Sequence, residues 1–134
     1  MQILIVEDEP LIALSLAEEL TRAGHSVIGP VGTSAEAMRL ADTERPDLAL
    51  VDIDLERKLA GISVARHLTL DLHIPSIYVT GQRAAAQRHA DTALGVITKP
   101  FQLSDITKAL DVAEKIIRGG TPPPPQVPGA MQLF

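Results

Sequence analysis

The chain of 134 residues has no cysteine, no tryptophan, one tyrosine and two phenylalanines. The absence of cysteine excludes disulfide scaffolds, thiolate zinc sites and cysteine nucleophiles. Because aromatic residues are so few, the core has to be built from Leu, Ile, Val and Ala. Basic residues are also in the minority, with 12 Lys and Arg against 17 Asp and Glu and a net charge of −5. We therefore expect no broad basic surface and no direct binding of nucleic acid.

The chain also begins without a long hydrophobic run. Residues 3–6 are apolar, and an acidic triplet follows at residues 7–9. Four apolar residues are too few for a signal peptide or a membrane span, so we expect a cytoplasmic protein without membrane insertion. At roughly 100–200 residues per domain, the length predicts one domain. We place this domain at residues 1–118, followed at 119–134 by a flexible Pro-rich tail with no second domain after it, and Pro122–Pro125 favour a polyproline II rod.

Short apolar runs alternate with helical hydrophobic stripes along the predicted domain. The runs are typical of buried parallel strands and cover residues 3–6, 26–29, 48–51, 77–79 and 95–98. The helical patterns cover residues 12–20, 33–41, 62–70, 83–90 and 103–117. Parallel strands need crossover connections, which are usually helical and right-handed. The alternation therefore predicts an α/β fold, a doubly wound five-stranded parallel sheet with helices on both faces.

Polar and charged residues directly follow four of the expected strands. They are Glu7 and Asp8 after the first strand, Asp52 and Asp54 after the third, Thr80 and Gly81 after the fourth, and Lys99 after the fifth. In an open parallel sheet, ligands bind beyond the carboxyl ends of the strands. Two carboxylates 4 Å apart repel by about 4 kcal/mol at an effective dielectric near 20, and a hard cation such as Mg²⁺ or Mn²⁺ relieves that repulsion. A metal, an ammonium group and a hydroxyl donor around one carboxylate are the parts that phosphoryl transfer needs.

These residues resemble the receiver domains of bacterial two-component response regulators. The resemblance covers about residues 2–118 and rests on the segments Val6-Glu7-Asp8-Glu9, Pro46-Asp47-Leu48-Ala49-Leu50-Val51-Asp52, Val79-Thr80-Gly81 and Lys99-Pro100-Phe101. It implies the (βα)5 flavodoxin-like receiver fold with strand order 2-1-3-4-5. It also implies that Asp52 accepts a phosphoryl group from a phosphohistidine on a sensor histidine kinase or a phosphotransfer protein.

The resemblance implies a role for each of the other site residues as well. The phosphoryl-binding residues would be Thr80, Lys99 and the amide of Gly81, with Ile53 beside the acceptor as a further cofactor-binding position. The ligands of Mg²⁺, or of Mn²⁺ in its place, would be Glu7, Asp8, Asp52 and Asp54 through its backbone carbonyl. A downstream protein target is expected to contact the face around residues 83–90, Val96 and residues 104–118. The resemblance is compatible with a monomer or a weak homodimer.

The chain departs from the family pattern at the position three residues before Lys99. Receivers usually carry Tyr or Phe there, whereas this chain has Val96, so the usual aromatic switch is expected to be absent or modified. Tyr78 lies on the same side of its strand as Thr80 and either replaces that ring or is structural. A receiver subgroup that serves kinases of the HWE class also lacks the aromatic, and this chain partly matches it at Pro75, Tyr78, Thr80 and Gly81.

A second departure lies in the loop that follows Asp52. Gly61 stands nine positions after Asp52, one more than in the common pattern, and residues 56–60 replace the usual Pro-containing loop. We expect this altered loop to affect the choice of kinase. Asp54 and Gln82 occupy the variable positions that tune how fast the phosphoryl group is hydrolysed.

Three functions are compatible with these residues. The first is a single-domain response regulator that is not an enzyme beyond its own phosphorylation and autodephosphorylation, with output through protein contacts or a phosphorelay. The second is a receiver-like binding module for which phosphorylation is dispensable. The third is a phosphotransferase, because Asp52-Ile53-Asp54 resembles the nucleophile motif of haloacid dehalogenase-type phosphatases, although no acidic pair follows Lys99 on a strand.

The histidines and the end of the tail remain outside these roles. The four histidines are scattered along the chain, at His25, His67, His73 and His89, so we expect surface positions for them. Residues 131–134 form an apolar end, which leaves a docking role open as an alternative to a disordered tail.

Overall fold

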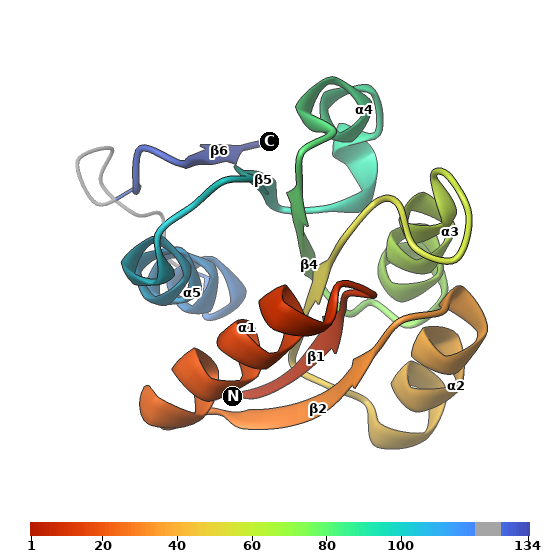
Figure 1. Ribbon diagram of the computed structural model, residues 1–134, viewed down its shortest axis with the longest axis horizontal. Helices are drawn as coiled ribbons and strands as arrows, with labels where there is room; N and C mark the ends of the chain where they lie inside the picture. Colours follow the sequence, from red (N-terminus) through yellow and green to blue (C-terminus); the bar gives the residue numbers. More distant parts are fainter. Residues whose placement is uncertain (120–126) are drawn as a thin grey trace.

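A six-stranded sheet in the described part of the chain forms the centre of the molecule (Figure 1). The computed structural model describes residues 1–119 and 127–134. The strands are β1 (Gln2–Val6), β2 (Ser26–Val31), β3 (Leu48–Val51), β4 (Ser76–Thr80), β5 (Gly95–Thr98) and β6 (Met131–Leu133). Their order is β2-β1-β3-β4-β5-β6, with the first five strands parallel and β6 antiparallel to β5. The expected α/β fold with order 2-1-3-4-5 is therefore confirmed, and β6 extends it.

The described residues contain five α-helices and two short helical turns. The helices are α1 (Pro10–Arg22), α2 (Ser34–Glu44), α3 (Ala60–Arg66), α4 (Arg83–Arg88) and α5 (Leu103–Ile117). The turns are the π-helical η1 (His67–Asp71), which continues α3, and the 3-10 turn η2 (Ala90–Thr92). Thr33 caps the start of α2, because its hydroxyl oxygen accepts the Glu36 backbone N–H at 3.3 Å. None of the described helices is both long and apolar enough to cross a membrane.

Each face of the sheet carries its own aliphatic core. One face lies against α1 and α5, with Leu16, Leu20 and Leu110 fully buried beside the strands. The other face lies against α2, α3 and α4, and small side chains such as Ala37 and Ala86 let these helices approach the sheet closely. The central strands β1 and β3 are buried on both faces, which explains why their sequences read as continuous apolar runs.

The end of the chain differs from the flexible tail expected over residues 119–134. Residues 131–133 form β6, and Met131 is buried in the same cluster as side chains of α5. The sheet edge supplies the backbone partners that so short a segment cannot find by itself. The expected polyproline rod at Pro122–Pro125 lies outside the described residues and stays a prediction.

Candidate functional site

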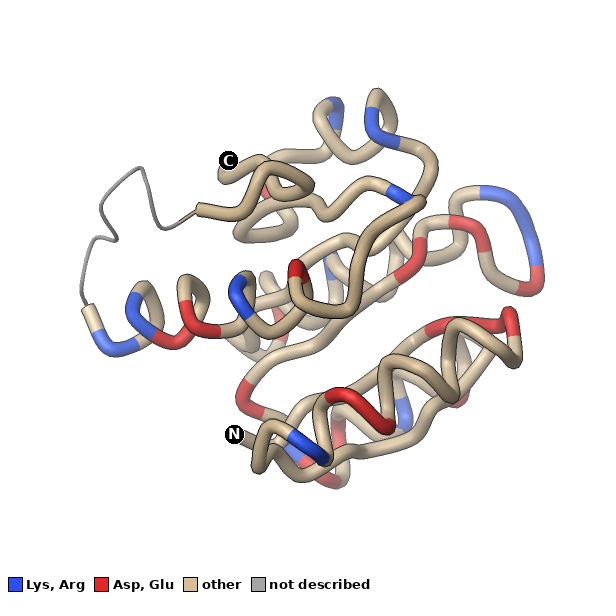
Figure 2. The backbone as a smooth tube through the Cα atoms, turned by 60° about the vertical axis from the view of Figure 1, so that its left-hand side comes forward, with Lys and Arg blue, Asp and Glu red and all other residues tan. Residues whose placement is uncertain are grey.

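Three acidic side chains meet at the carboxyl end of the sheet. Glu7 and Asp8 follow β1, and Asp52 follows β3, which pairs with β1. One carboxylate oxygen of each residue lies within 4.8 Å of the other two. In Figure 2 the acidic segments after β1 and β3 lie at the same end of the molecule. The structure thus brings together three of the four metal ligands expected from the sequence.

This cluster has the composition of a site for a hard divalent cation. Glu7 and Asp52 are buried, with 4% and 9% of their surface exposed, whereas Asp8 is exposed and leaves the cluster open on one side. All three donors are carboxylate oxygens, which Mg²⁺ prefers and which zinc sites rarely use alone. The residues present therefore fit a Mg²⁺ ion, and the same donor set suits Mn²⁺.

Lys99 lies at the edge of the acidic cluster. Its Nζ is 2.6 Å from an oxygen of Glu7 and 3.2 Å from an oxygen of Asp52. Burial lowers the pKa of the Lys99 ammonium, but the hydrogen bond to Glu7 and the charges of Asp52 and Glu7 outweigh burial and raise this pKa above its ordinary value. Lys99 therefore stays cationic and neutralises part of the acidic charge.

The Glu7 carboxyl binds its proton more tightly than an ordinary glutamate does. Burial raises the pKa of Glu7 to about 7, and the negative charge of Asp52 adds to that rise, although the hydrogen bond from Lys99 lowers the pKa. The other Glu7 oxygen accepts the backbone N–H of Glu9 at 3.2 Å. A divalent cation would favour the ionised form of this carboxyl, so binding of the cation and release of a proton are coupled.

Thr80 is the last residue of β4, and Gly81 follows it beside the cluster. Thr80 is buried, and its hydroxyl oxygen accepts the backbone N–H of Gln82 at 3.0 Å, which leaves the hydroxyl proton to donate elsewhere. The Thr80 carbonyl accepts the backbone N–H of Lys99 at 3.0 Å, so the ends of β4 and β5 are tied together. A side chain at Gly81 would meet nothing within 4 Å, so this position lies in open space.

Ile53 and Gly61 hold the loop that follows Asp52. The Gly61 backbone N–H donates to the Ile53 carbonyl at 2.7 Å, and the Ile53 side chain is fully buried in the core. A Cβ atom at Gly61 would overlap the carbonyl of Asp52, so only glycine lets α3 approach this strand end. The structure therefore gives both residues a part in positioning Asp52.

The Asp54 side chain lies apart from the three clustered carboxylates. One of its oxygens accepts the backbone N–H of Leu59 at 2.8 Å, and the other accepts the side-chain amide of Gln82 at 3.2 Å. The Asp54 side chain is thus engaged in the loop, and the expected contribution of its backbone carbonyl to the metal stays a prediction. The sequence does not predict the contact between Asp54 and Gln82, because this contact joins two loops across 28 positions of sequence.

The family model of the response regulator receiver domain matches residues 3–111 of the chain. The chain belongs to this family. All four strand ends that carry the site lie inside the matched part of the receiver.

Curated relatives of this receiver are longer proteins. It is 35% identical over 115 residues to the transcriptional regulatory protein PdtaR of Mycobacterium tuberculosis, a match that covers 84% of this chain and 56% of PdtaR. It is also 35% identical over 115 residues to the phyllosphere-induced regulator PhyR of Methylorubrum extorquens, covering 84% of this chain and 43% of PhyR. The receiver therefore spans about half the length of these relatives.

Solved structures share the fold of this receiver. The signal receiver domain of a modulated diguanylate cyclase from Desulfovibrio desulfuricans superposes with a TM-score of 0.79 at 32% identity, over 87% of this chain and 95% of that one. The receiver domain of the sensor histidine kinase PA1611 from Pseudomonas aeruginosa, solved with magnesium in its active site cleft, has a TM-score of 0.71 at 26% identity, over 82% of this chain and 93% of that one.

At the position of the usual switch aromatic, this receiver has a fully buried valine. Val96 pairs with Tyr78 in the neighbouring strand and belongs to the core on the α3 and α4 face. Tyr78 is also fully buried, and its hydroxyl shares a hydrogen bond of 2.5 Å with Thr92. Thr92 in turn donates to the His89 carbonyl at 2.6 Å, which leaves the Tyr78 hydroxyl as the donor. Tyr78 therefore holds η2 against the sheet, as a structural aromatic.

The altered loop between β3 and α3 is tied to the start of α2. The Glu56 carboxylate accepts the Ser34 backbone N–H at 3.0 Å and its hydroxyl at 2.5 Å. These hydrogen bonds lower the pKa of Glu56, as expected for an anion at a helix N-terminus. Nothing in the sequence indicates that Glu56 would reach the start of α2.

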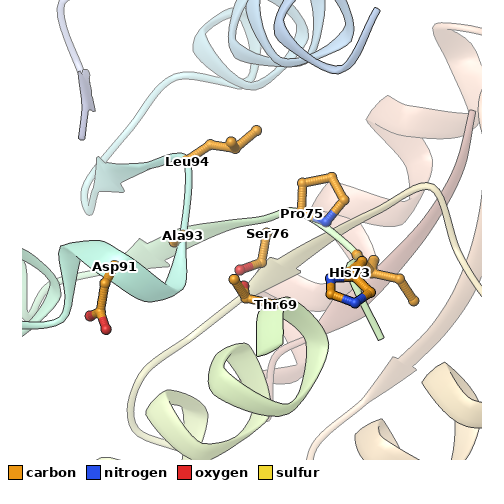
Figure 3. A pocket seen from close by; sticks show the side chains of 8 residues that line it. Thr69, His73, Pro75, Ser76, Asp91, Ala93 and Leu94 are labelled. Carbon is orange, nitrogen blue, oxygen red and sulfur yellow. The ribbon is translucent and has the colours of Figure 1, made fainter. Parts of the chain in front are cut away.

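Two hollows on the surface differ in their relation to the site. A groove of about 570 Å³ runs between the start of α1 and the segment after β5, and it is lined by Glu9, Leu11, Ile12, Ser15, Lys99, Pro100, Phe101 and Leu103. A cavity of about 310 Å³ lies at the other end of the sheet, before β4 and β5, where Figure 3 shows Thr69, His73 and Asp91 around it. The hydroxyls of Thr69 and Ser76 in that cavity both donate to the Thr92 carbonyl, at 2.7 and 3.1 Å. Only the first hollow contains a predicted site residue, Lys99.

Proposed function

We propose that Asp52 accepts a phosphoryl group from a phosphohistidine of a sensor histidine kinase or a phosphotransfer protein. An oxygen of the Asp52 carboxylate forms a bond to phosphorus, the bond between phosphorus and the donor imidazole nitrogen breaks, and that nitrogen takes up a proton. The observation that carries the proposal is the ion pair of Asp52 with Lys99 at 3.2 Å inside a cluster of three carboxylates. An ionised carboxylate held by a cation at the open end of a sheet is a suitable nucleophile for this transfer.

The neighbouring residues supply the charge balance that the transfer needs. Lys99 leaves Asp52 for an oxygen of the incoming phosphoryl group, and the Thr80 hydroxyl and the Gly81 amide donate to the other oxygens. Glu7, Asp8 and Asp52, with the backbone carbonyl of Asp54, would hold Mg²⁺, which supplies positive charge next to the phosphoryl oxygens. The low exposure of Glu7 and Asp52 strengthens each of these electrostatic interactions.

The groove beside Lys99 is suited to the donor protein. Leu11 and Leu14 on α1 are 75% and 55% exposed, and Leu103 is 37% exposed at the start of α5. Leu11 and Leu103 line the same groove as Lys99, where a donor helix has to bring its phosphohistidine. The partial match at Pro75, Tyr78, Thr80 and Gly81 favours a donor kinase of the HWE class.

We further propose that the receiver is a single-turnover acceptor and turns over no external substrate. Its output then comes from contacts with a downstream protein target or from passing the phosphoryl group along a relay, as a monomer or a weak homodimer. The magnesium ion in the PA1611 receiver, a relative at 26% identity, supports the Mg²⁺ dependence of this scheme.

A second function is favoured by one observation, the buried Val96. Without a ring at this position, the charge change at Asp52 has no aromatic side chain to move, which favours a module that binds its target without phosphorylation. The Asp52→Ala variant separates the two functions. It keeps target binding unchanged if the second function holds and alters it if the first one does.

The decisive experiment records NMR chemical shifts on addition of Mg²⁺, and then of beryllofluoride as a mimic of the phosphoryl group. We expect Mg²⁺ to shift the amides of Glu7, Asp8 and Asp52, and beryllofluoride to extend the shifts to Thr80 and α5. If beryllofluoride caused no chemical-shift changes in the presence of Mg²⁺, the proposal would be overturned.

A matched pair of variants tests the acceptor itself. Treatment with acetyl phosphate and Mg²⁺ should add one phosphoryl group to the wild type, detected by intact-mass measurement. Asp52→Asn should take up none, whereas Asp54→Asn should take up the group and mainly change its rate of loss. Uptake by Asp52→Asn at the wild-type level would place the acceptor elsewhere.

A further inference from the structure

The edge of β5 is covered by the chain's own C-terminal residues. β6 pairs antiparallel with β5, matching Gly95 to Leu133 and Ile97 to Met131. Backbone hydrogen bonds flank this pairing, because the Thr98 N–H donates to the Ala130 carbonyl at 3.1 Å and the Phe134 N–H donates to the Leu94 carbonyl at 2.9 Å. Figure 1 shows β6 alongside β5. Residues 130–134 thus lie as an extended peptide lies when it adds a strand to an exposed sheet edge.

The side chains of this strand make contacts beyond the backbone ladder. Met131 is 6% exposed and belongs to the core cluster of α5, and Leu133 packs against the same cluster. Gln132 points the other way, and its side-chain oxygen accepts the Gln87 amide of α4 at 2.8 Å. The apolar positions therefore alternate with a polar one, which is the pattern that a sheet edge selects in a bound strand.

The absence of a side chain at Gly95 leaves room for β6. A Cβ atom at Gly95 would overlap the carbonyl of Gln132 and would lie 3.3 Å from the Cα of Leu133. The backbone of Gly95 does not have a positive φ, so the conformation of β5 does not require glycine here. The close approach of β6 is what requires it.

The covering strand is held by few interactions compared with the strands inside the sheet. β6 has three residues and pairs with one neighbour, whereas β1 has five residues and pairs with two. Short edge elements of this kind open at a lower free energy than the core of a domain. A strand that leaves uncovers the backbone groups of β5 and an apolar position beside α5.

We propose that the β5 edge is an interaction surface for an extended segment of a partner protein, and that β6 is the occupant of this surface within the chain. The segment that fits it is a strand with apolar residues at the positions of Met131 and Leu133 and a polar residue between them. The partner segment pairs with β5 in the place of β6, and β6 leaves the sheet. The surface exists whether or not Asp52 is phosphorylated, so the proposal goes beyond the proposed function and stands apart from it.

A peptide added to the full chain tests this proposal. The probe is the octapeptide of residues 127–134, Val-Pro-Gly-Ala-Met-Gln-Leu-Phe, carrying a fluorophore at its N-terminus. The host is the Met131→Asp chain, in which β6 is expelled because a carboxylate is unfavourable in the apolar core. We expect the peptide to bind this host at least tenfold more tightly than the wild type, in which β6 competes at high effective concentration. Bound peptide should also restore the slow hydrogen exchange of the Thr98 amide.

Two controls make the outcome decisive. The same peptide with Asp in place of Met131 should not bind, and a Gly95→Val host should release β6 without accepting the peptide. Leu133→Asp serves as a second host if Met131→Asp does not fold, because Leu133 is only partly buried. A folded host that binds no peptide would overturn the proposal, and so would equal binding to the Met131→Asp chain and to the Gly95→Val chain.

Discussion

Lys99 forms its shorter ion pair with Glu7, at 2.6 Å, rather than with the proposed acceptor Asp52, at 3.2 Å. Glu7 is therefore engaged by an ammonium group at the place where a divalent cation is expected. Ion binding has to compete both with Lys99 and with the proton that burial favours on Glu7.

The affinity for Mg²⁺ should rise with pH. Because the pKa of Glu7 is raised to about 7, this carboxyl is mostly neutral at pH 6 and mostly ionised at pH 8. The ionised form binds the cation, so calorimetric titration should give tighter binding at pH 8. Glu7→Gln should weaken binding at pH 8 by about 10-fold or more and abolish most of the pH dependence. Equal affinity of the wild type at the two pH values would contradict this assignment.

Gly61→Ala should destabilise the fold and disturb the site together. The added methyl group would overlap the Asp52 carbonyl, so either α3 or the end of β3 has to move. We expect a loss of about 2–4 kcal/mol in the free energy of unfolding, measured by urea denaturation. Gly81→Ala is the matched control, because its methyl group would meet no atom within 4 Å and should change stability by less than about 1 kcal/mol. Similar losses in both variants would refute the steric argument.

Tyr78→Phe should separate a structural tyrosine from a switching one. The variant keeps the buried ring and removes only the hydrogen bond to Thr92. We expect a loss of about 1 kcal/mol in stability and unchanged uptake of a phosphoryl group from acetyl phosphate. If the beryllofluoride-induced NMR shifts in α5 disappeared in this variant, Tyr78 would be part of the switch after all.

The stability of the domain should depend on His67 near neutral pH. Hydrogen bonds to Asp42 and to Asp71, both at 2.8 Å, raise the pKa of His67 above 6.5 against the opposing effect of burial. A raised pKa means that the stabilisation is fully present below the unfolded value of about 6.5 and is lost as the pH rises through the higher folded value. The contribution is about 1 kcal/mol or less, because the pair is partly exposed to solvent.

Thermal unfolding of His67→Gln tests this dependence. The melting temperature of the wild type should fall relative to that of the variant as the pH is raised from 6 to 8. A wild-type curve parallel to that of His67→Gln across this range would exclude the proposed role.

The sequence predicts well which residues lie at the carboxyl ends of the strands, because the apolar runs mark where each strand ends. Glu7, Asp52, Thr80 and Lys99 each directly follow an apolar run, and the parallel order brings all four strand ends to one edge of the sheet. The aliphatic character of the core follows from composition, and its division between the two faces of the sheet follows from the alternation of strands and helices. Neither prediction depends on the exact path of a loop.

The features that the sequence does not predict depend on loop geometry and distant pairing. The Asp54 carboxylate accepts the backbone N–H of Leu59, a residue with a positive φ of 65°, and no local pattern indicates that conformation. His67 meets Asp42 across 25 positions, so its isolated place in the sequence conceals a partner. β6 is too short for its alternation of apolar and polar residues to be recognised in the sequence. Its position is explained only by the edge of β5, where Gly95 leaves room for it.

The hydrogen bonds from Ser34 to Glu56 have a consequence for molecular recognition. They fasten the loop beside Asp52 to a helix before any partner arrives, so the entropy of ordering this loop is lost during folding rather than on association. A protein that docks here meets a rigid template, and discrimination between rival partners then depends on shape complementarity rather than on mutual adaptation. Glu56→Ala removes the acceptor of both bonds and so frees the loop, which broadens the range of partners at the expense of affinity for each of them.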